Sequence, residues 1–173
     1  AAEWPWLASY PSAIPWDMSF PPERVDKLLD ESIERFPDRP CVEFLGKRYS
    51  YRQIGDYVAR TAAGLQAQGV TKGTRVGLFL PNCPYSVIAY YAILRADAVV
   101  VPVSPMNLTD ELAHYLADSG ATTAIIGSEL YKHVRPLMGS LLHHAIVATY
   151  SDYLTEATSM NVPDVIRAPR APV

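Results

Sequence analysis

Cysteine and long apolar runs are scarce in this sequence. Its two cysteines, Cys41 and Cys83, are too few among 173 residues for a disulfide framework, which predicts two reduced thiols in a cytoplasmic protein. No apolar run approaches the roughly 20 residues that span a bilayer. The first residues show no basic stretch followed by an apolar segment, so we expect no secretory signal.

A surplus of charge of one sign is also absent. The chain carries 15 basic and 18 acidic residues, a formal net charge of −3, with no block of like charge. Surfaces that bind nucleic acid are strongly basic, and polybasic segments attract anionic lipids. We therefore expect no nucleic-acid partner and no polybasic membrane patch.

Glycine-rich phosphate loops are absent as well. A dinucleotide-binding turn needs glycines after the first strand, so that the backbone can approach the pyrophosphate. The corresponding turn here is Pro81-Asn82-Cys83-Pro84, and no G-x-x-x-x-G-K-[ST] loop occurs. The sequence thus argues against a Rossmann cofactor site and against a P-loop.

The strongest pattern that is present is a βαβ unit in residues 69–105. Apolar, strand-like runs at 76–80 and 98–103 flank a segment at 84–96 that is apolar on nearly every side. Parallel strands are buried on both faces and are joined by helices. The pattern therefore predicts a buried parallel sheet.

The residues before this unit predict a helix, a hairpin and a second helix. Apolar residues at helical spacing predict a helix within 23–36. Strand-like runs at 41–44 and 48–51 predict a hairpin with a Gly46-Lys47 turn. A Ser50–Gln53 capping box is expected to start the second helix, and Gly69 followed by Val70 to end it.

After the unit, helices and strands continue to alternate. Thr109 is expected to cap a helix that ends at Gly120, with three residues facing inward: Leu112, Tyr115 and Leu116. Strands are expected at 121–126 and 144–149, joined by two short helices because Pro136 interrupts the segment that Ser128 starts.

This order predicts an α/β fold: a mostly parallel sheet with helices on both faces, preceded by an extended arm. We expect the arm at residues 1–22, the α/β subdomain at 23–159 and a proline-rich linker or loop at 160–173. The arm holds all three tryptophans, with Tyr10 and Phe20. Because buried aromatic residues usually serve packing, we expect it to dock on its own domain, with a dimer or membrane contact as the alternative.

Residues of types that carry chemistry are scattered. His143 and His144 are adjacent, so on a strand they point to opposite faces and cannot share a metal. Cys83 lies at an expected helix N-terminus, which lowers a thiol pKa, but no partner base is near it. Packing, capping or surface roles are expected for the remaining candidates: His114, His133, Asn82, Ser86 and Ser104. We therefore expect no catalytic, cofactor-binding or metal-binding residue in this chain.

A series of short segments resembles the acyl-activating (AMP-forming) synthetases, in the family's order and spacing. They are FPDRP at 36–40, YSYRQI at 49–54, AGL at 63–65, GV at 69–70, KGTRV at 72–76, LPN at 80–82, LRA at 94–96, VPVSP at 101–105, EL at 111–112 and DSGA at 118–121. The arm, with Trp6-Leu7, Tyr10-Pro11 and Ile14-Pro15, looks most like bacterial long-chain fatty-acid–CoA ligases. Asp97 and Ser104 depart from the family's usual glycine and asparagine.

The resemblance implies the N-terminal subdomain of the acyl-CoA synthetase and luciferase-like fold, and a ligase acting on a fatty acid. Such an enzyme uses ATP, Mg²⁺ and CoA: the carboxylate attacks the ATP α-phosphate to give an acyl-adenylate, and the CoA thiol then displaces AMP. The family's phosphate loop, adenine motif and catalytic lysine would follow Val173, so we expect the 173-residue chain alone to be inactive and to bind none of these cofactors.

Two alternatives to a fatty-acid–CoA ligase stay open. The first is a stand-alone, non-catalytic binding or assembly module. The second is part of another adenylating enzyme, such as an aryl-CoA ligase or an acyl-AMP ligase. A homodimer formed through the arm and peripheral membrane association are further expectations. Acyl chain length is not encoded in these residues, because the acyl pocket would be built mainly by others.

Overall fold

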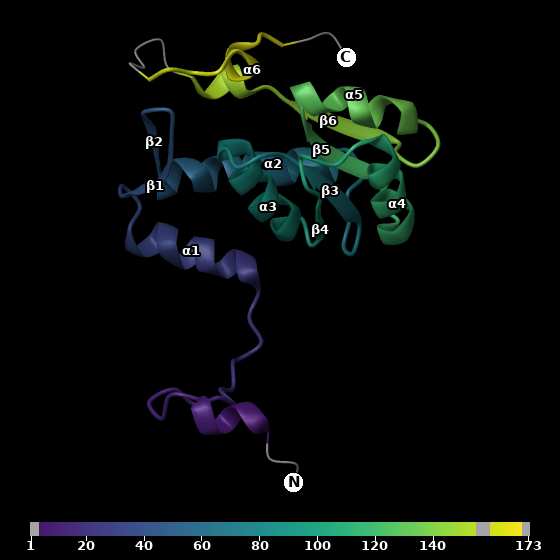
Figure 1. The fold of residues 1–173 in the computed structure, drawn as a ribbon. Coiled ribbons are helices and arrows are strands. Elements are labelled where there is room, and N and C mark those ends of the chain that lie inside the picture. Colours follow the sequence, from purple (N-terminus) through teal and green to yellow (C-terminus); the bar gives the residue numbers. More distant parts are fainter. Residues whose placement is uncertain (1–3, 155–159, 171–173) are drawn as a thin grey trace.

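Four parallel strands form the central sheet, in the order β4-β3-β5-β6 (Figure 1). The computed structural model describes residues 4–154 and 160–170. The strands are β3 (Arg75–Phe79), β4 (Val99–Pro102), β5 (Thr123–Gly127) and β6 (His144–Ala148). Each expected strand is present, displaced by at most two residues, and the expected α/β class is confirmed.

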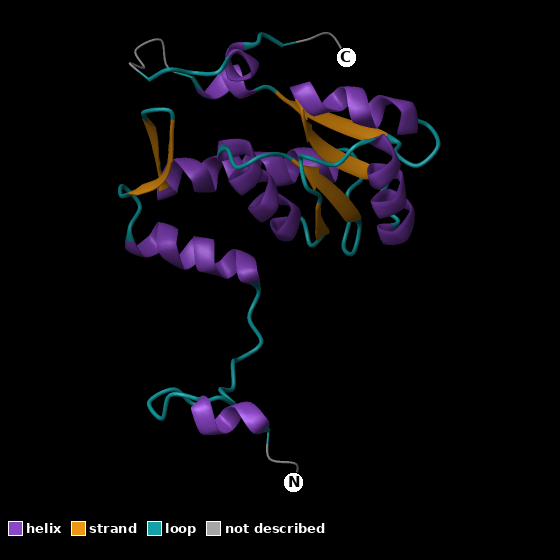
Figure 2. Cartoon of the chain, in the orientation of Figure 1, coloured by secondary structure: helices purple, strands orange, loops and turns teal. Residues whose placement is uncertain are grey.

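Helices cover both faces of this sheet (Figure 2). On one face α3 (Pro84–Arg95) packs beside α2 (Tyr51–Ala67), with α1 (Val25–Arg35) against both. The opposite face is covered by α4 (Thr109–Ser119) and α5 (Tyr131–Val134). We call the apolar residues around α2 and α3 the larger core, and those around α4 and α5 the smaller core.

Strand β3 contributes to both cores because alternate side chains point to opposite faces. Val76 and Leu78 belong to the larger core, and Phe79 to the smaller one. Gly77 lies opposite Ala124 of β5, and a Cβ on Gly77 would sit 3.1 Å from the Ala124 Cβ. The small residues at this pair let the two central strands lie side by side beneath the helices.

The expected hairpin forms, with its turn displaced by one residue. Strands β1 (Pro40–Phe44) and β2 (Lys47–Ser50) pair antiparallel, and the turn is Leu45-Gly46, not Gly46-Lys47. Both turn residues have positive φ angles, 48° and 85°. A two-residue hairpin of this kind needs positive φ at both central positions, so Gly46 takes the second position and Leu45 accepts the cost at the first.

Both ends of α2 match their sequence signals. The Ser50 hydroxyl accepts a hydrogen bond from the Gln53 N–H (3.3 Å), and the Gln53 side chain accepts one from the Ser50 N–H (2.9 Å). Gly69 has a φ of 88°, and the Val70 N–H donates to the Leu65 carbonyl at 3.0 Å. Val70 is buried, which completes the apolar contact that follows a glycine-terminated helix.

Helix α4 differs from expectation at two residues. Its N-cap is Leu108, whose N–H donates to Glu111, so the expected capping role of Thr109 is wrong. The Thr109 hydroxyl instead donates to the His133 carbonyl (3.0 Å) and ties α4 to α5. Tyr115 was expected to face inward but is 45% exposed, whereas Leu112 and Leu116 are buried in the smaller core.

Two proline-containing segments are more structured than their sequence suggests. Between β5 and β6 the chain forms three consecutive pieces instead of two short helices: 3₁₀ turns at Ser128–Leu130 and Arg135–Leu137 flank α5. A third 3₁₀ turn, Tyr150–Tyr153, follows β6. Residues 160–170 include α6 (Asp164–Arg167), and Ile166 packs against the larger core.

The described part of the arm, residues 4–22, extends away from the body of the protein (Figure 1). A 3₁₀ helix (Pro5–Ser9) begins it, and the rings of Trp4 and Trp6 stack with centroids 4.9 Å apart. Both tryptophans are about half exposed, and none of the described arm residues, 4–22, joins either core. The expectation that the arm docks on its own domain is therefore wrong. Among the described residues, no helix has the length and apolar character needed to cross a bilayer.

We expect Ser50→Ala to destabilise the protein by about 1 kcal/mol, since it removes the acceptor of the α2 capping box. Urea unfolding monitored by circular dichroism measures this change. The matched control is Ser32→Ala in α1, where the hydroxyl donates only to the Leu28 carbonyl of its own helix. Alanine is the better helix former there, so Ser32→Ala should be neutral or stabilising. Equal destabilisation by both variants would contradict the capping role.

Candidate functional site

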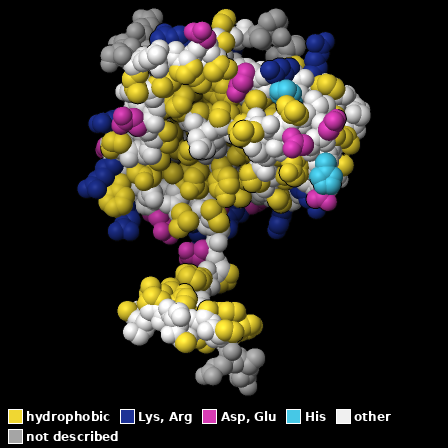
Figure 3. All heavy atoms as spheres, viewed as in Figure 1, with side chains coloured by type: hydrophobic (Ala, Val, Ile, Leu, Met, Phe, Trp, Pro, Cys, Tyr) yellow, Lys and Arg dark blue, Asp and Glu magenta, His cyan; other side chains and the backbone are white. Residues whose placement is uncertain are grey.

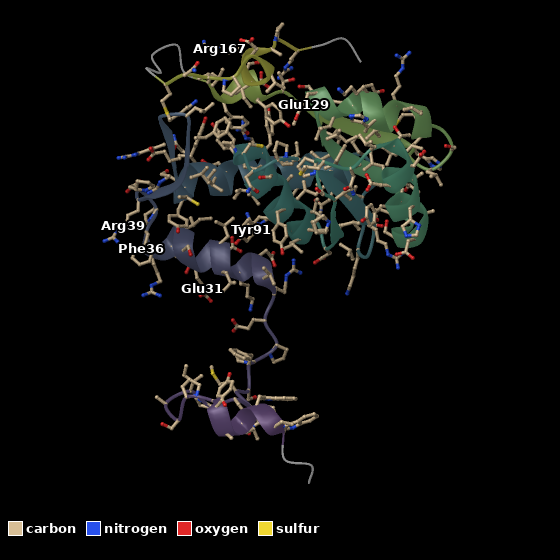
Figure 4. The ribbon with its side chains drawn as sticks, in the orientation of Figure 1. Glu31, Phe36, Arg39, Tyr91, Glu129 and Arg167 are labelled. Carbon is tan, nitrogen blue, oxygen red and sulfur yellow. The ribbon has the colours of Figure 1, made fainter. Side chains whose placement is uncertain are left out.

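The carboxyl ends of β3 and β5 form the position at which open α/β sheets commonly bind ligands. The chain leaves β3 toward α3 on one face and leaves β5 toward α5 on the other. Connections that diverge in this way leave a crevice between the strand ends. Cys83, Glu129 and Tyr150 lie there, close enough to interact electrostatically. Figure 4 labels Glu129 at this edge of the sheet.

Half-buried Glu129 and fully buried Tyr150 form a hydrogen-bonded pair at this edge. The Tyr150 hydroxyl donates to Glu129 Oε1 at 2.7 Å, and Tyr150 is 1% exposed. Burial, and then the hydrogen bond to Glu129, raises the pKa of Tyr150 above its ordinary value. Among the described residues Glu129 Oε2 is buried and has no hydrogen-bond partner. One carboxylate oxygen of the pair is therefore a buried acceptor to which no group in the described part of the chain donates.

Gly127 makes room for this pair. A Cβ on Gly127 would lie 2.1 Å from the Tyr150 hydroxyl oxygen and 2.9 Å from Glu129 Oε2. Its φ of −65° is ordinary for any residue, so space and not backbone conformation requires glycine here. Its role is thus steric: a side chain from the turn after β5 and one from the turn after β6 lie where a Cβ on Gly127 would be.

Cys83 lacks the surroundings of a reactive thiol. It is the N-cap of α3, where its N–H donates to the Ser86 hydroxyl (3.1 Å) and its carbonyl accepts from the same hydroxyl (2.7 Å). Burial raises the pKa of the Cys83 thiol, which lowers the fraction of nucleophilic thiolate. Asn82 was expected to be the helix cap, but it precedes the cap and is exposed.

The residues at these strand ends do not fit a nucleotide phosphate. Pro84 occupies the first position of α3 and has no N–H to offer, and the Cys83 N–H is already bound by Ser86. The turn contains no glycine, and Glu129, whose charge acts on Cys83, would repel a phosphate. This edge of the sheet supports local structure and offers no cradle for an anion.

An apolar hollow of about 480 Å³ lies between α2, α3 and the sheet. Its floor is formed by Ile125, Ile146 and Ala148, and its walls include the rings of Tyr57, Tyr85 and Tyr153. Figure 3 shows hydrophobic side chains gathered over the middle of this face and on the arm. A hollow of this composition suits an apolar side chain or ligand better than a charged one.

A polar link closes one side of the hollow. The Tyr85 and Tyr153 rings pack edge to face at 4.4 Å, and the Tyr85 hydroxyl donates to Asp152 at 2.8 Å. Arg170 donates to the same Asp152 oxygen at 2.8 Å and, with burial opposing it, lowers the pKa of that carboxyl. The segment at 160–170 is thereby joined to the carboxyl end of β6.

The structure does not bring the candidate histidines and serines together with Cys83, except for Ser86. His143 and His144 are exposed at the amino end of β6, far along the sheet from the strand ends that hold Cys83. His114 is exposed on α4, and His133 lies on α5, where its carbonyl accepts the Thr109 hydroxyl. Over residues 4–154 and 160–170, no group of three or more His, Cys, Asp or Glu residues could hold a metal ion.

Comparison with known proteins identifies the family. The family described as AMP-binding enzyme matches residues 29–170. The chain belongs to the AMP-binding enzyme family. Its similarity to the long-chain-fatty-acid–CoA ligase of Bacillus subtilis is 35% identity over 151 residues, which cover 87% of this chain and 27% of that protein.

Other members of the AMP-binding family extend this result. The salicyl-AMP ligase/salicyl-S-ArCP synthetase of Mycobacterium tuberculosis is 36% identical over 124 residues, covering 69% of this chain and 21% of that protein. The crystal structure of a long-chain-fatty-acid–CoA ligase from Archaeoglobus fulgidus superposes with a TM-score of 0.69 at 28% identity, over 76% of this chain and 28% of that one. The chain thus spans between a fifth and a third of the length of these relatives.

Sequence reasoning missed the Glu129–Tyr150 pair. The two residues are 21 positions apart, and neither stands in a motif that predicts chemistry. The one available signal was topological: Glu129 follows β5 and Tyr150 follows β6, and the carboxyl ends of adjacent parallel strands meet at one edge.

We expect Gly127→Ala to destabilise the protein by about 1–3 kcal/mol, because the new methyl group overlaps the buried Tyr150 hydroxyl. The matched control is Gly64→Ala in α2, where a Cβ has no neighbour within 4 Å. Alanine at that helical position should stabilise by about 0.5–1 kcal/mol. Urea unfolding measures both changes.

Combining Gly127→Ala with Tyr150→Phe sharpens this test. Phenylalanine lacks the oxygen that the new methyl group would meet, so the cost of Gly127→Ala should be smaller in the Tyr150→Phe background. Identical costs in the two backgrounds would show that the Tyr150 hydroxyl is not what requires glycine.

Proposed function

We propose that these 173 residues serve as the N-terminal α/β subdomain of a fatty-acid–CoA ligase. The complete enzyme would convert ATP, a fatty acid and CoA into acyl-CoA, AMP and pyrophosphate. The observation that carries this proposal is the match of the AMP-binding family over residues 29–170, together with 35% identity to a long-chain-fatty-acid–CoA ligase. The superposition on a ligase of the same description supports it independently.

Within that enzyme, the chain would act as scaffold. Its candidate groups at the strand ends are a protonated Cys83 thiol and a Glu129 carboxylate that is paired with Tyr150. The turn after β3 lacks the free N–H groups that hold a phosphate. We therefore assign ATP, Mg²⁺ and CoA to other parts of the enzyme, and no catalytic, cofactor-binding or metal-binding residue to this chain.

The scaffold role predicts a clear difference between two proteins in an ATP–pyrophosphate exchange assay. The 173-residue chain should show no exchange dependent on fatty acid, because it lacks the groups that bind and activate ATP. A longer protein that contains this sequence and continues past Val173 should show exchange with a long-chain fatty acid. Exchange by the 173-residue chain would overturn the scaffold role, and a longer protein inactive with every carboxylic acid would overturn the ligase assignment.

An aryl-acid adenylating enzyme is the second candidate. The similarity to a salicyl-AMP ligase, at 36% identity, favours it specifically. Exchange assays with a long-chain fatty acid and with a hydroxylated aryl acid side by side separate the two candidates. Transfer of the acyl group to CoA or to a carrier protein then distinguishes a CoA ligase from an acyl-AMP ligase. A stand-alone assembly module would show neither activity in any protein that contains the sequence.

We further propose that the arm mediates association. Its large apolar side chains are 43–74% exposed and are not used by its own domain: Trp4, Trp6, Tyr10, Ile14, Trp16, Met18 and Phe20. Clustered exposed apolar residues of this kind mark contact sites. The contact we favour is a homodimer, with a peripheral membrane contact as the alternative, in a protein whose two unpaired cysteines suit the cytoplasm.

Deleting residues 1–20 should therefore convert a dimer into a monomer, as measured by light scattering. Sedimentation with neutral lipid vesicles tests the alternative, because the described arm carries no lysine or arginine to attract anionic lipid. If the deletion leaves the mass of the particle unchanged, the arm does not form the dimer. If it leaves the fraction of protein that sediments with vesicles unchanged, the arm does not bind the membrane.

A further inference from the structure

Asp97 adopts a backbone conformation that usually requires glycine. It follows α3 with a φ of 59°, in the left-handed region. The Asp97 N–H donates to the Leu94 carbonyl (3.0 Å) and the Ala98 N–H to the Ile93 carbonyl (3.1 Å), the two bonds of a Schellman helix end. Glycine occupies such a position without steric cost, whereas aspartate accepts a cost. The turn by itself gives no reason for a carboxylate here.

The Asp97 carboxylate has a specific partner, Arg24. The Arg24 guanidinium donates to Asp97 and also to the Leu94 carbonyl at 3.1 Å. This contact places a cation at the C-terminal end of α3, where the helix dipole favours positive charge. One arginine thus joins the side chain at the left-handed position to the last turn of the helix before it.

Arg24 is itself held in place from the other side. It pairs with both carboxylate oxygens of Asp26, each at 3.0 Å, and Asp26 is buried. The bond from Arg24 is the main reason that the pKa of Asp26 lies below its ordinary value. A second pair, Arg95 with Asp30, joins the same end of α3 to α1. Four charged groups in addition to Arg24 therefore fix α1 against α3.

Arg24 lies where the arm meets α1, so this cluster of charges fixes the point from which the arm leaves the body. Arg24 is the N-cap of α1, separated from the arm (residues 1–22) only by Glu23, and residues 18–24 form no helix or strand. It is 73 positions from Asp97, so the contact joins the root of the arm to the turn between α3 and β4. Of the described arm, residues 4–22, no residue belongs to either core.

We propose that Arg24 is a clamp that fixes the root of the arm on the end of α3, and that Asp97 is an aspartate in order to hold that clamp. The clamp sets the direction in which the arm leaves the body and keeps its aromatic residues away from the domain's own surface. This role is independent of the proposed ligase function, because it concerns only residues of this chain.

Two readouts follow the root of the arm directly. All three tryptophans of the chain lie in the arm, so time-resolved tryptophan anisotropy of the 173-residue chain reports on arm motion alone. Trypsin cleaves after Arg24 only when the guanidinium is free to enter the protease, so the rate of that cut, followed by mass spectrometry, reports on release of the clamp. The variants are Asp97→Asn, which removes the charge, and Asp97→Gly, which also removes the backbone cost.

Both variants should be cut after Arg24 about two- to fivefold faster than the wild-type chain, the change expected from the loss of one exposed ion pair. The fast component of the anisotropy decay should grow in both. The control is Asp38→Asn, which breaks the exposed Arg52–Asp38 pair on the hairpin side of the protein and should change neither readout. Circular dichroism checks that all variants are folded.

The two Asp97 variants distinguish a carboxylate that holds Arg24 from a residue that serves only the left-handed turn. If Asp97 served only the turn, Asp97→Gly would be cut at the wild-type rate or more slowly, because glycine suits the left-handed conformation. Wild-type rates of cleavage and of anisotropy decay in both variants would overturn the clamp. Equal acceleration by Asp38→Asn would also overturn it, since the effect would then not depend on Arg24.

Discussion

The structure depends on the burial of β3 and β5 on both faces. These neighbouring strands carry apolar side chains in alternation, so one set faces α2 and α3 and the other faces α4 and α5. A parallel pair of this kind is stable only when helices cover both faces. The connections that provide this cover diverge at the carboxyl ends of the two strands, where Cys83, Glu129 and Tyr150 lie.

In this chain the groups at the carboxyl ends of β3 and β5 serve packing and local hydrogen bonds. Ligand sites of open α/β sheets normally use free N–H groups at the strand ends, but here Pro84, Ser86 and the Glu129–Tyr150 pair occupy this edge. The apolar hollow beside α2 and α3 and the aromatic arm are two apolar surfaces available for contact with another molecule. This arrangement agrees with the proposed role of the chain as a scaffold.

Much of the fold could be predicted because its signals are local. The Ser50–Gln53 box, the glycine after α2 and the apolar strand runs act within a few residues of themselves, and each appears where expected. Three predictions were wrong for a shared reason: that Tyr115 faces inward, that Thr109 caps α4, and that the hairpin turn is Gly46-Lys47. Each depends on a neighbour in space, or on a one-residue choice of register, that helical spacing and turn propensity do not specify.

The sequence by itself determined the order of the main helices and strands, both ends of α2, the parallel sheet and the resemblance to a family, because short-range patterns specify each of these. The tertiary structure alone decided that the arm stands away from its domain, that Glu129 pairs with Tyr150, and that Arg24 reaches Asp97. These contacts join residues 21 and 73 positions apart. No local propensity encodes them, since they exist only once the strands and helices have brought their ends together.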